Sequence, residues 1–256
     1  MKLQVKDIKF SYNSKSILNK VNFKVKKGEI VGILGPNGSG KTTLLKCINK
    51  NLKIDYGSVY IQKQDIKNLK QKQIAEKMGY VPQEDANNFP STVFDTVLMG
   101  RRPHSTWRPS TKDKEIVTNI LEKIDLKDQA TRDINELSGG QRQKALIARA
   151  LAQQPEILIF DEPTSSLDVK HQLEVLDLIK KETKTDVSAI MAIHDINLAS
   201  KYCDKFIFLK DGEILDAGGT EVINQENIRK VYGVEAEIKK FDNQKLIILK
   251  NSLQKN

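Results

Sequence analysis

The feature that most constrains the fold is the glycine-rich segment at residues 35–42, GPNGSGKT, which fits the spacing G-x-x-x-x-G-K-[ST]. The short apolar run Ile30–Leu34 precedes it, and the segment TTLLKCINK that follows Lys41 is typical of a helix. A short continuous apolar run predicts a strand buried on both faces. Strand, loop and helix in this order favour a phosphate-binding loop over a glycine-rich turn that binds nothing.

The residue types of this loop suit an anion. Glycines let successive backbone N–H groups converge on one anion without a Cβ in the way, and the following helix N-terminus adds its dipole. Lys41 is placed to reach β- and γ-phosphates, and Thr42 offers a hydroxyl to Mg²⁺. The residues predicted to hold the phosphates are Gly35, Pro36, Asn37, Gly38, Ser39, Gly40, Lys41, Thr42 and Thr43.

A second motif places two carboxylates at the end of an apolar strand. The run Ile157–Phe160 is followed directly by Asp161 and Glu162, and α/β sheets bind ligands at the carboxyl ends of their strands. Asp161 suits Mg²⁺, and Glu162 suits orienting or polarising a water molecule. Taken alone, two solvated acids at a strand end explain this pattern equally well. Beside a phosphate-binding loop, the functional interpretation is favoured.

A third motif, LSGGQ at residues 137–141, leads into the helical segment RQKALIARALA. Ser138 is suited to cap that helix, and the paired glycines Gly139 and Gly140 expose backbone N–H groups at its N-terminus. The motif is therefore either a second anion site or an ordinary glycine-rich helix start. General principles leave both readings open.

The order of the remaining elements predicts an α/β fold with a helical insert. Residues 1–84 begin with strand patterns, among them the alternation of Val21, Phe23 and Val25. Residues 85–136 have helical spacing of apolar residues and predict a mainly helical subdomain. Residues 137–256 resume the core, because a helix near 169–182 separates the buried strands 157–160 and 187–193. We therefore expect one α/β core, 1–84 with 137–256, and one helical subdomain, 85–136.

Composition excludes several classes of protein. The longest apolar run, Ala189–Ile193, is far shorter than the ~20 residues of a membrane span, and no secretory signal is expected. The two cysteines, Cys47 and Cys203, are too few for a disulfide framework or a zinc site and are expected to be buried. The net charge of +9 is spread along the chain, so it does not by itself identify a partner. We expect a cytosolic chain.

The phosphate loop, LSGGQ and ILIFDEP (157–163), in this order, resemble the ATP-binding cassette (ABC) ATPases over nearly the whole chain. The resemblance implies a P-loop NTPase cassette: a mixed sheet core with an N-terminal antiparallel β subdomain and a helical subdomain. It implies ATP and Mg²⁺ as cofactors and an active ATPase, since no catalytic position departs from the family pattern. A small-molecule kinase on a P-loop fold would leave LSGGQ and SSLD (165–168) unexplained.

The resemblance also assigns roles to individual residues. Tyr12 would stack on adenine, although a core or turn tyrosine is the alternative. The implied catalytic residues are Glu162, His194, Gln83 and Lys41. The implied Mg²⁺ ligands are Thr42, Gln83 and Asp161. The residues that would reach the nucleotide of a second cassette are Ser138, Gly139, Gly140, Gln141 and Asp168. A structural role is expected for His104, His171 and Trp107.

Three local segments resemble the importer branch for ferric siderophores, haem and cobalamin: VFDTVLMGRRPH (93–104), the LSGGQ helix and VYGV (231–234). This implies a homodimer, heterodimers remaining open, with two permease subunits and, indirectly, an extracellular substrate-binding protein. The chain would lie on the cytoplasmic face of the membrane. For Arg101 and Arg102 the sequence favours two readings equally: part of the permease contact, or a solvated basic pair. Zinc or manganese importers remain alternatives. A nucleic-acid role is not favoured, since no sustained heptads occur. A ribosome role is not favoured either, because family members on ribosomes generally carry two cassettes in one chain and this sequence has one.

Overall fold

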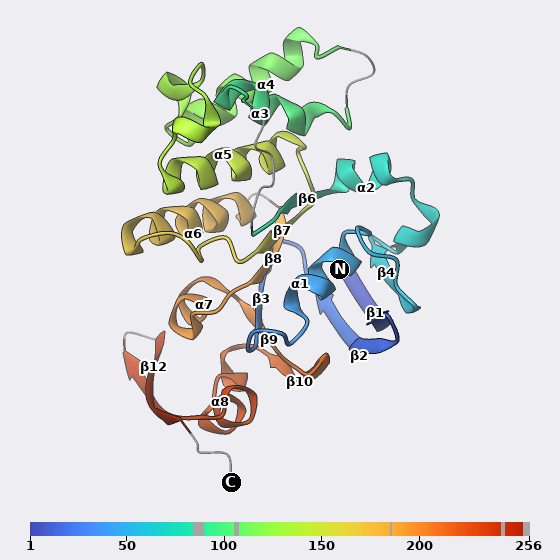
Figure 1. The fold of residues 1–256 in the computed structure, drawn as a ribbon, viewed down its shortest axis with the longest axis vertical. Helices are drawn as coiled ribbons and strands as arrows, with labels where there is room; N and C mark the ends of the chain where they lie inside the picture. The colour runs from blue at the N-terminus through green and yellow to red at the C-terminus, as the bar shows by residue number, and fades with distance from the viewer. Residues whose placement is uncertain (84–89, 105–107, 185, 242–243, 253–256) are drawn as a thin grey trace.

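The computed structural model describes residues 1–83, 90–104, 108–184, 186–241 and 244–252. Its elements form a large central sheet, a smaller antiparallel sheet beside it, and a group of helices at one end (Figure 1). The N-terminus starts the smaller sheet, and the C-terminal segment lies at the end opposite the helical group. The mixed sheet core, the N-terminal antiparallel sheet and the helical group expected from the sequence are confirmed.

The central sheet has six strands in the order β10-β9-β3-β8-β7-β6. The neighbouring pairs are parallel, except that β10 runs antiparallel to β9. Every residue of β3, β7 and β8 is buried, as their continuous apolar runs predict. The strands are β3 (Ile30–Leu34), β6 (Met78–Val81), β7 (Ile157–Asp161), β8 (Ser188–Ala192), β9 (Lys205–Lys210) and β10 (Glu213–Gly218).

The smaller sheet pairs its strands antiparallel in the order β2-β1-β4-β5. The alternation predicted at the end of β2 is observed, because Val21, Phe23 and Val25 are buried and the residues between them are exposed. The strands are β1 (Leu3–Tyr12), β2 (Lys15–Val25), β4 (Tyr56–Ile61) and β5 (Gln64–Asp65). They stand beside β3 and α1 in Figure 1.

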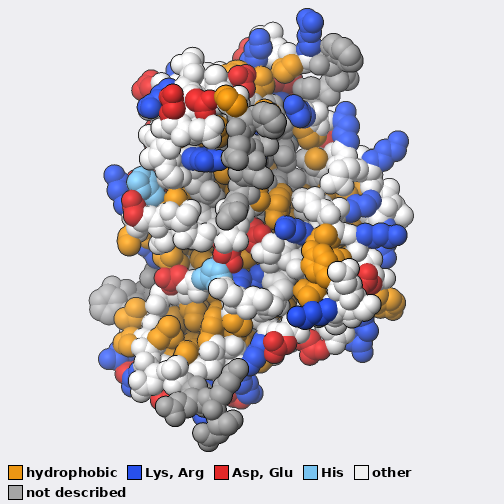
Figure 2. Space-filling view, in the orientation of Figure 1, with side chains coloured by type: hydrophobic (Ala, Val, Ile, Leu, Met, Phe, Trp, Pro, Cys, Tyr) orange, Lys and Arg blue, Asp and Glu red, His pale blue; other side chains and the backbone are white. Residues whose placement is uncertain are grey.

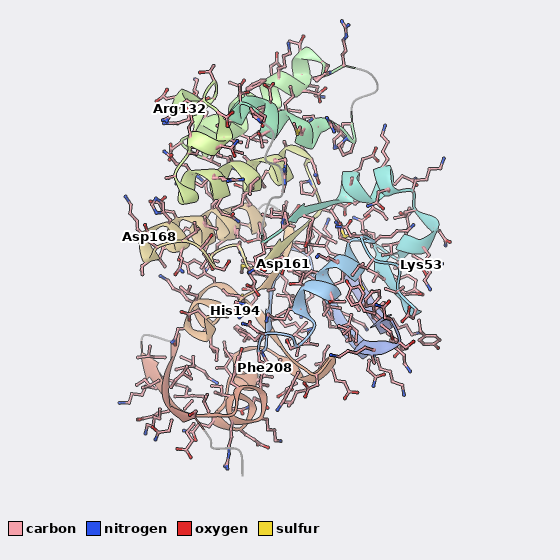
Figure 3. The ribbon with its side chains drawn as sticks, viewed as in Figure 1. Lys53, Arg132, Asp161, Asp168, His194 and Phe208 are labelled. Atoms are coloured by element: carbon pink, nitrogen blue, oxygen red, sulfur yellow. The ribbon has the colours of Figure 1, made fainter. Side chains whose placement is uncertain are left out.

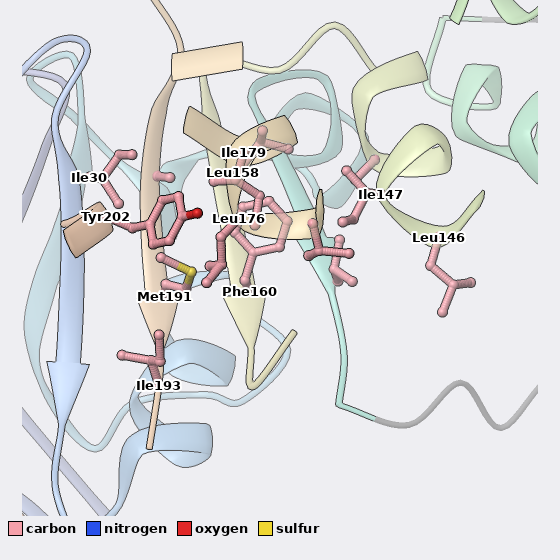
Figure 4. Packing of buried hydrophobic residues seen from close by; sticks show 14 of the residues in the cluster. Ile30, Leu146, Ile147, Leu158, Phe160, Leu176, Ile179, Met191, Ile193 and Tyr202 are labelled. Carbon is pink, nitrogen blue, oxygen red and sulfur yellow. The ribbon is translucent and has the colours of Figure 1, made fainter. Parts of the chain in front are cut away.

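Two hydrophobic cores lie on the two faces of the central sheet. Alternate residues of each strand join opposite cores: Ile159 packs with the smaller sheet and α1 (Lys41–Ile48), whereas Phe160 packs with the helices of the other face. Figure 4 shows Phe160 beside Leu176 and Met191 beside Tyr202 in that core. The helices of that face are α5 (Gly139–Ala152), α6 (Val169–Thr183), α7 (Ile196–Tyr202) and α8 (Gln225–Tyr232).

Between β6 and α5 the described elements are helical. They are α3 (Val93–Leu98), α4 (Thr111–Lys123) and short 3-10 turns, and they pack on α5 at one end of the molecule (Figure 1). The division of the chain at 85 and 136 stays a prediction. The chain closes with a hairpin, β11 (Val234–Phe241) and β12 (Gln244–Ser252), beside α7 and α8.

Several elements escaped the sequence analysis, among them α2 (Gln71–Lys77), β6 and α7. The strand β6, MGYV, is short and contains a glycine, so no period is visible in it. Gly79 eases the packing there, because a Cβ would lie a tight 3.0 Å from the carbonyl oxygen of Ala150. Both cysteines are buried, as predicted.

No helix in the described part of the chain combines the length and hydrophobicity needed to cross a membrane. On the face shown in Figure 2, basic side chains are scattered widely, and apolar side chains gather near the C-terminal hairpin.

Candidate active site

A cavity of about 510 Å³ opens at the carboxyl ends of the central strands. Nine of the residues predicted to form a nucleotide site line it together. The lining residues are Ile17, Asn37, Gly38, Gly40, Lys41, Thr42, Thr43, Gln83, Glu162 and His194. Figure 3 places Asp161 and His194 near the middle of the molecule, where β7 and β8 end. Five separate stretches of sequence therefore converge on one cavity.

The loop after β3 lines the cavity and depends on glycine conformations. Gly38 and Gly40 have φ angles of 79° and 102°, which side chains other than glycine rarely adopt. A Cβ on Gly35 would lie 2.1 Å from the carbonyl oxygen of Leu209 on β9. The left-handed Gly40 begins α1 without any side-chain cap. The first N–H groups of α1 are thus left without a side-chain acceptor, which is the arrangement that binds phosphate.

Lys41 is held inside its own loop. Its side chain is buried, and Nζ donates to the carbonyl oxygens of Gly35 and Pro36 at 2.9 and 3.1 Å. Burial lowers the pKa of Lys41, and the nearby carboxylates of Glu162 and Asp161 oppose that shift. The ammonium is therefore fixed at the mouth of the loop with acidic groups close by.

Asp161 and Thr42 form the oxygen-rich part of the site. The Thr42 hydroxyl donates to Oδ1 of Asp161 at 2.8 Å, and the Tyr80 hydroxyl donates to Oδ2 at 3.3 Å. Burial of Asp161 raises its pKa, and these two hydrogen bonds oppose the shift. Burial, with Asp161 beside it, also raises the pKa of Tyr80. Sequence analysis missed Tyr80, since a tyrosine in a short strand carries no signal of its own.

This donor set fits Mg²⁺. The hydroxyl of Thr42 and the carboxylate of Asp161 are hard oxygen ligands, already side by side. Among the described residues, no group of three or more His, Cys, Asp or Glu side chains forms a dedicated metal cage. One or two protein oxygens completed by substrate phosphates is how Mg²⁺ is commonly held.

Glu162 stands between two polar side chains from neighbouring strands. Gln83, after β6, donates from Nε2 to Oε2 of Glu162 at 2.8 Å, and His194 Nε2, after β8, lies 2.5 Å from Oε1. Glu162 itself has a φ of 54°, a left-handed conformation that a non-glycine residue adopts at some energetic expense. Its amide donates to the carbonyl oxygen of Ala192 at 3.2 Å. The fold therefore holds this carboxylate in a strained, doubly contacted position.

The residues predicted to act on a second cassette do not line the cavity. Ser138 caps α5, its Oγ accepting from the amide of Gln141 at 3.3 Å, and Asp168 caps α6. Figure 3 shows Asp168 at the outer end of α6, away from Asp161 and His194. In one chain they form a separate surface, so their role stays a prediction.

Tyr12 also lies outside the residues that line the cavity. It is exposed, and its ring packs edge-on against Phe10 with centroids 4.7 Å apart. Ile17 of β2, which the sequence analysis did not single out, lines the cavity instead. Adenine stacking on Tyr12 stays a prediction.

Arg101 is neither a solvated residue nor exposed for a permease contact, so for this residue both readings were wrong. Its side chain is 7% exposed, and Nε lies 2.8 Å from Oδ1 of Asp113. Nη1 donates to the carbonyl oxygen of Ala152 at 2.6 Å, at the end of α5. The guanidinium holds the pKa of Asp113 far below its usual range. Charge in the sequence does not reveal burial, because the partners come from other elements.

The sequence analysis also expected a structural role for His104 and Trp107. His104 Nε2 lies 2.7 Å from the carbonyl oxygen of Gln153, which agrees with a structural role. Trp107 lies outside the described residues. The exposed Arg102 keeps its place as a candidate permease contact.

The fold and the cavity define a P-loop ATPase: a phosphate loop, a strand-end Asp161–Glu162 pair and a histidine converge on one site. The family model for the ABC transporter matches residues 18–165, and the chain belongs to this family. As an ABC cassette it binds ATP.

Relatives agree with this family. An uncharacterised ABC transporter ATP-binding protein of Methanocaldococcus jannaschii is 54% identical over 93% of this chain and 94% of its own length. The petrobactin import ATP-binding protein of Bacillus anthracis is 39% identical over 92% of this chain and 88% of its own.

Solved structures give the same picture. An inward-facing metal-chelate type ABC transporter matches with a TM-score of 0.86 and 27% identity, over 98% of this chain and 97% of that one. A bacterial ABC transporter cassette, described as dimeric, matches with a TM-score of 0.74 and 31% identity, over 85% and 98%.

Proposed function

We propose that this chain is the ATP-hydrolysing subunit of an importer that takes up a metal chelate, a ferric siderophore, haem or cobalamin, through a separate membrane permease. The observation that carries the proposal is the convergence of Lys41, Glu162 and His194 on one cavity within a cassette fold. Asp161 lies directly behind its lining, hydrogen-bonded to Thr42. The chelate class is supported by relatives and a structural neighbour named for petrobactin import and for metal-chelate transport.

Hydrolysis proceeds by in-line attack of water on the γ-phosphate. Glu162 accepts or orients the water proton, since Gln83 and His194 fix its two carboxylate oxygens. Lys41 and the amides of the phosphate loop bind the β- and γ-phosphates, and His194 holds the γ-phosphate in line. Mg²⁺, held by Thr42, Asp161 and Gln83, supplies charge neutralisation on the phosphate oxygens when bound.

The working unit is a pair of copies stacked head to tail. Ser138, Gly139, Gly140, Gln141 and Asp168 of one copy close over the nucleotide held by the other. This pairing is supported by their position at the starts of two helices, outside the cavity of their own chain. Donors supplied only in the closed pair stabilise phosphate charge only in that state. ATP then favours the closed pair, and hydrolysis reopens it.

The permease contact lies on the segment from Gln83 to Arg102, part of which is outside the described residues. Two permease subunits bind one pair of cassettes, and an extracellular binding protein delivers the cargo to them. The chain is peripheral on the cytoplasmic face of the membrane. Its net charge of +9 suits an anionic membrane surface.

Co-purification from native membranes tests this function. The tagged chain carries Glu162→Gln to hold the closed pair, and mass spectrometry identifies what accompanies it. A multi-span permease is expected, and its identity narrows the cargo. The matched control is Lys41→Ala, which lacks the closing nucleotide. If the accompanying permease transports zinc or manganese, the proposed cargo changes from a metal chelate to that metal ion. Ribosomal proteins or nucleic acid without any permease would overturn the transport function and leave the ATPase chemistry intact.

A further inference from the structure

His171 lies where the two surface motifs of the chain meet. It is in the first turn of α6, and its Nδ1 lies 2.9 Å from both carboxylate oxygens of Asp168. Its backbone amide donates to Oδ1 of Asp168, also at 2.9 Å. An ionised carboxylate only accepts hydrogen bonds, so Nδ1 carries the donated proton. The carboxylate of Asp168 is therefore contacted by both the side chain and the backbone amide of His171.

The other side of the same imidazole ring lies against Gly140 in the LSGGQ segment. A Cβ on Gly140 would lie 2.2 Å from Cδ2 of His171 and 2.5 Å from its Cγ. Contacts under 3.0 Å do not occur for real Cβ atoms, so this ring occupies the volume that any side chain at 140 would need. Gly139 is different, since its nearest neighbour would be Leu167 Cδ2 at an ordinary 3.8 Å.

A second contact joins the same two helices farther along. Nζ of Lys144 on α5 lies 2.6 Å from Oε2 of Glu174 on α6, and both side chains are partly buried. Gln172 donates to the carbonyl oxygen of Thr164 at 3.2 Å, which ties α6 to the loop before Asp168. The ion pair fixes the helices to each other, whereas His171 alone touches both Gly140 and Asp168 in these contacts.

We propose that His171 is a positioning residue that holds residues 138–141 and Asp168 of one copy in a fixed arrangement. Both motifs need this arrangement to reach the nucleotide of the other copy together. The proposal deepens the proposed function and rests on its head-to-tail pairing. The ring supplies a donor toward Asp168 and a flat edge toward Gly140. Neither contact belongs to the cavity of its own chain, so His171 acts on the second copy and not on ATP binding in the first.

Two binding measurements on the full chain carrying Glu162→Gln test this proposal. ATP affinity is measured at protein concentrations below pairing, and ATP-dependent pairing is measured by sedimentation. His171→Leu keeps bulk against Gly140 but removes the donor. We expect it to weaken pairing about tenfold, the size of one hydrogen bond to a charged group, and to leave ATP affinity within twofold. His171→Asn, whose amide nitrogen reaches Asp168, restores pairing.

The control is Lys144→Met, which removes the neighbouring ion pair and leaves the loop contacts in place; pairing unchanged by it supports a role specific to His171. The proposal is overturned if His171→Leu pairs as tightly as its parent, if it loses ATP affinity and pairing together, or if Asn fails to restore pairing. A parent chain that binds ATP but never pairs overturns the head-to-tail function itself. That outcome is separate, because it does not depend on residue 171.

Discussion

Three helices of this chain begin at the phosphate loop, at LSGGQ and at Asp168, and they begin in different ways. The first, α1, starts at a left-handed glycine with no side-chain cap, and its lysine is buried. The others, α5 and α6, are capped by their own Ser138 and Asp168, and the Asp168 side chain is 67% exposed. An uncapped helix start leaves all its first N–H groups for a ligand, whereas a capped one has part of them satisfied within its chain.

This contrast separates two kinds of surface. The side around α1 is complete in one chain, since Lys41, Asp161 and Glu162 have partners from the same molecule. The side around Ser138 and Asp168 is stable by itself but meets no cavity of its own chain. Substitutions around α1 should therefore have effects in a single copy. Substitutions around Ser138 and Asp168 should have effects on function only when copies pair.

The largest effect is expected on the complete side, from Glu162→Gln. Removing a general base lowers a rate by about 10²–10⁴-fold, so ATP hydrolysis should fall by at least about 100-fold while ATP binding remains. Steady-state phosphate release and nucleotide binding measure the two. The control is Glu136→Gln, an exposed acid in a surface ion pair. Hydrolysis at the wild-type rate would refute the role of Glu162.

The next effect concerns how the capped side is supported from its far end. Arg101→Met leaves Asp113 buried without its cation and removes a donor from the end of α5. We expect a loss of about 3–5 kcal/mol in the free energy of unfolding, measured with urea. Arg102→Met, at the exposed neighbouring position, should leave stability nearly unchanged. Equal effects of the two variants would contradict the buried pair.

The same ion pair predicts a pH dependence. The folded-state pKa of Asp113 is depressed, mainly by its hydrogen bonds to Arg101 and Ser110. A depressed pKa stabilises the fold above the unfolded-state pKa of about 4, and this contribution is lost as pH falls. The stability gap between wild type and Asp113→Asn should therefore be constant from pH 7 to about 4 and shrink below it. A gap that widens in acid would reverse the assignment.

A smaller effect separates capping from action on a second copy. Ser138→Asn replaces one good N-cap with another, so single-chain stability should stay within about 0.5 kcal/mol. The longer side chain moves the donor, and we expect ATP-dependent pairing of Glu162→Gln chains to weaken about tenfold. Thermal unfolding and sedimentation measure the two. Unaltered pairing would limit Ser138 to capping its own helix.

The smallest effect is expected for Tyr12→Ala. If Tyr12 stacks on adenine, ATP affinity falls by several-fold, near the low end of the ~1–3 kcal/mol of base stacking. The matched control is Tyr56→Ala, an exposed tyrosine on β4. Equal affinities of both variants would leave Ile17 as the apolar neighbour of the base.

Elements with continuous apolar runs could be predicted from sequence, since β3, β7 and β8 are buried on both faces. The phosphate loop was predictable because its glycine spacing is set by local geometry. The contacts that finish the site were not. Thr42 and Asp161 are 119 positions apart. An arginine in a sequence is expected to be exposed, and Arg101 is buried only because Asp113 and the end of α5 pack against it. Long-range packing supplies these contacts, and no local pattern encodes them.

The hydrogen bonds of Lys41 to Gly35 and Pro36 have a consequence for how this lysine is studied. The ammonium acts as an internal brace that ties both ends of its loop together. A phosphate that binds Lys41 therefore replaces some of its hydrogen bonds to the loop carbonyl oxygens, because the ammonium already has these partners. Lys41→Ala removes the charge and slackens the loop in one step, so its phenotype is a sum of affinity and loop order.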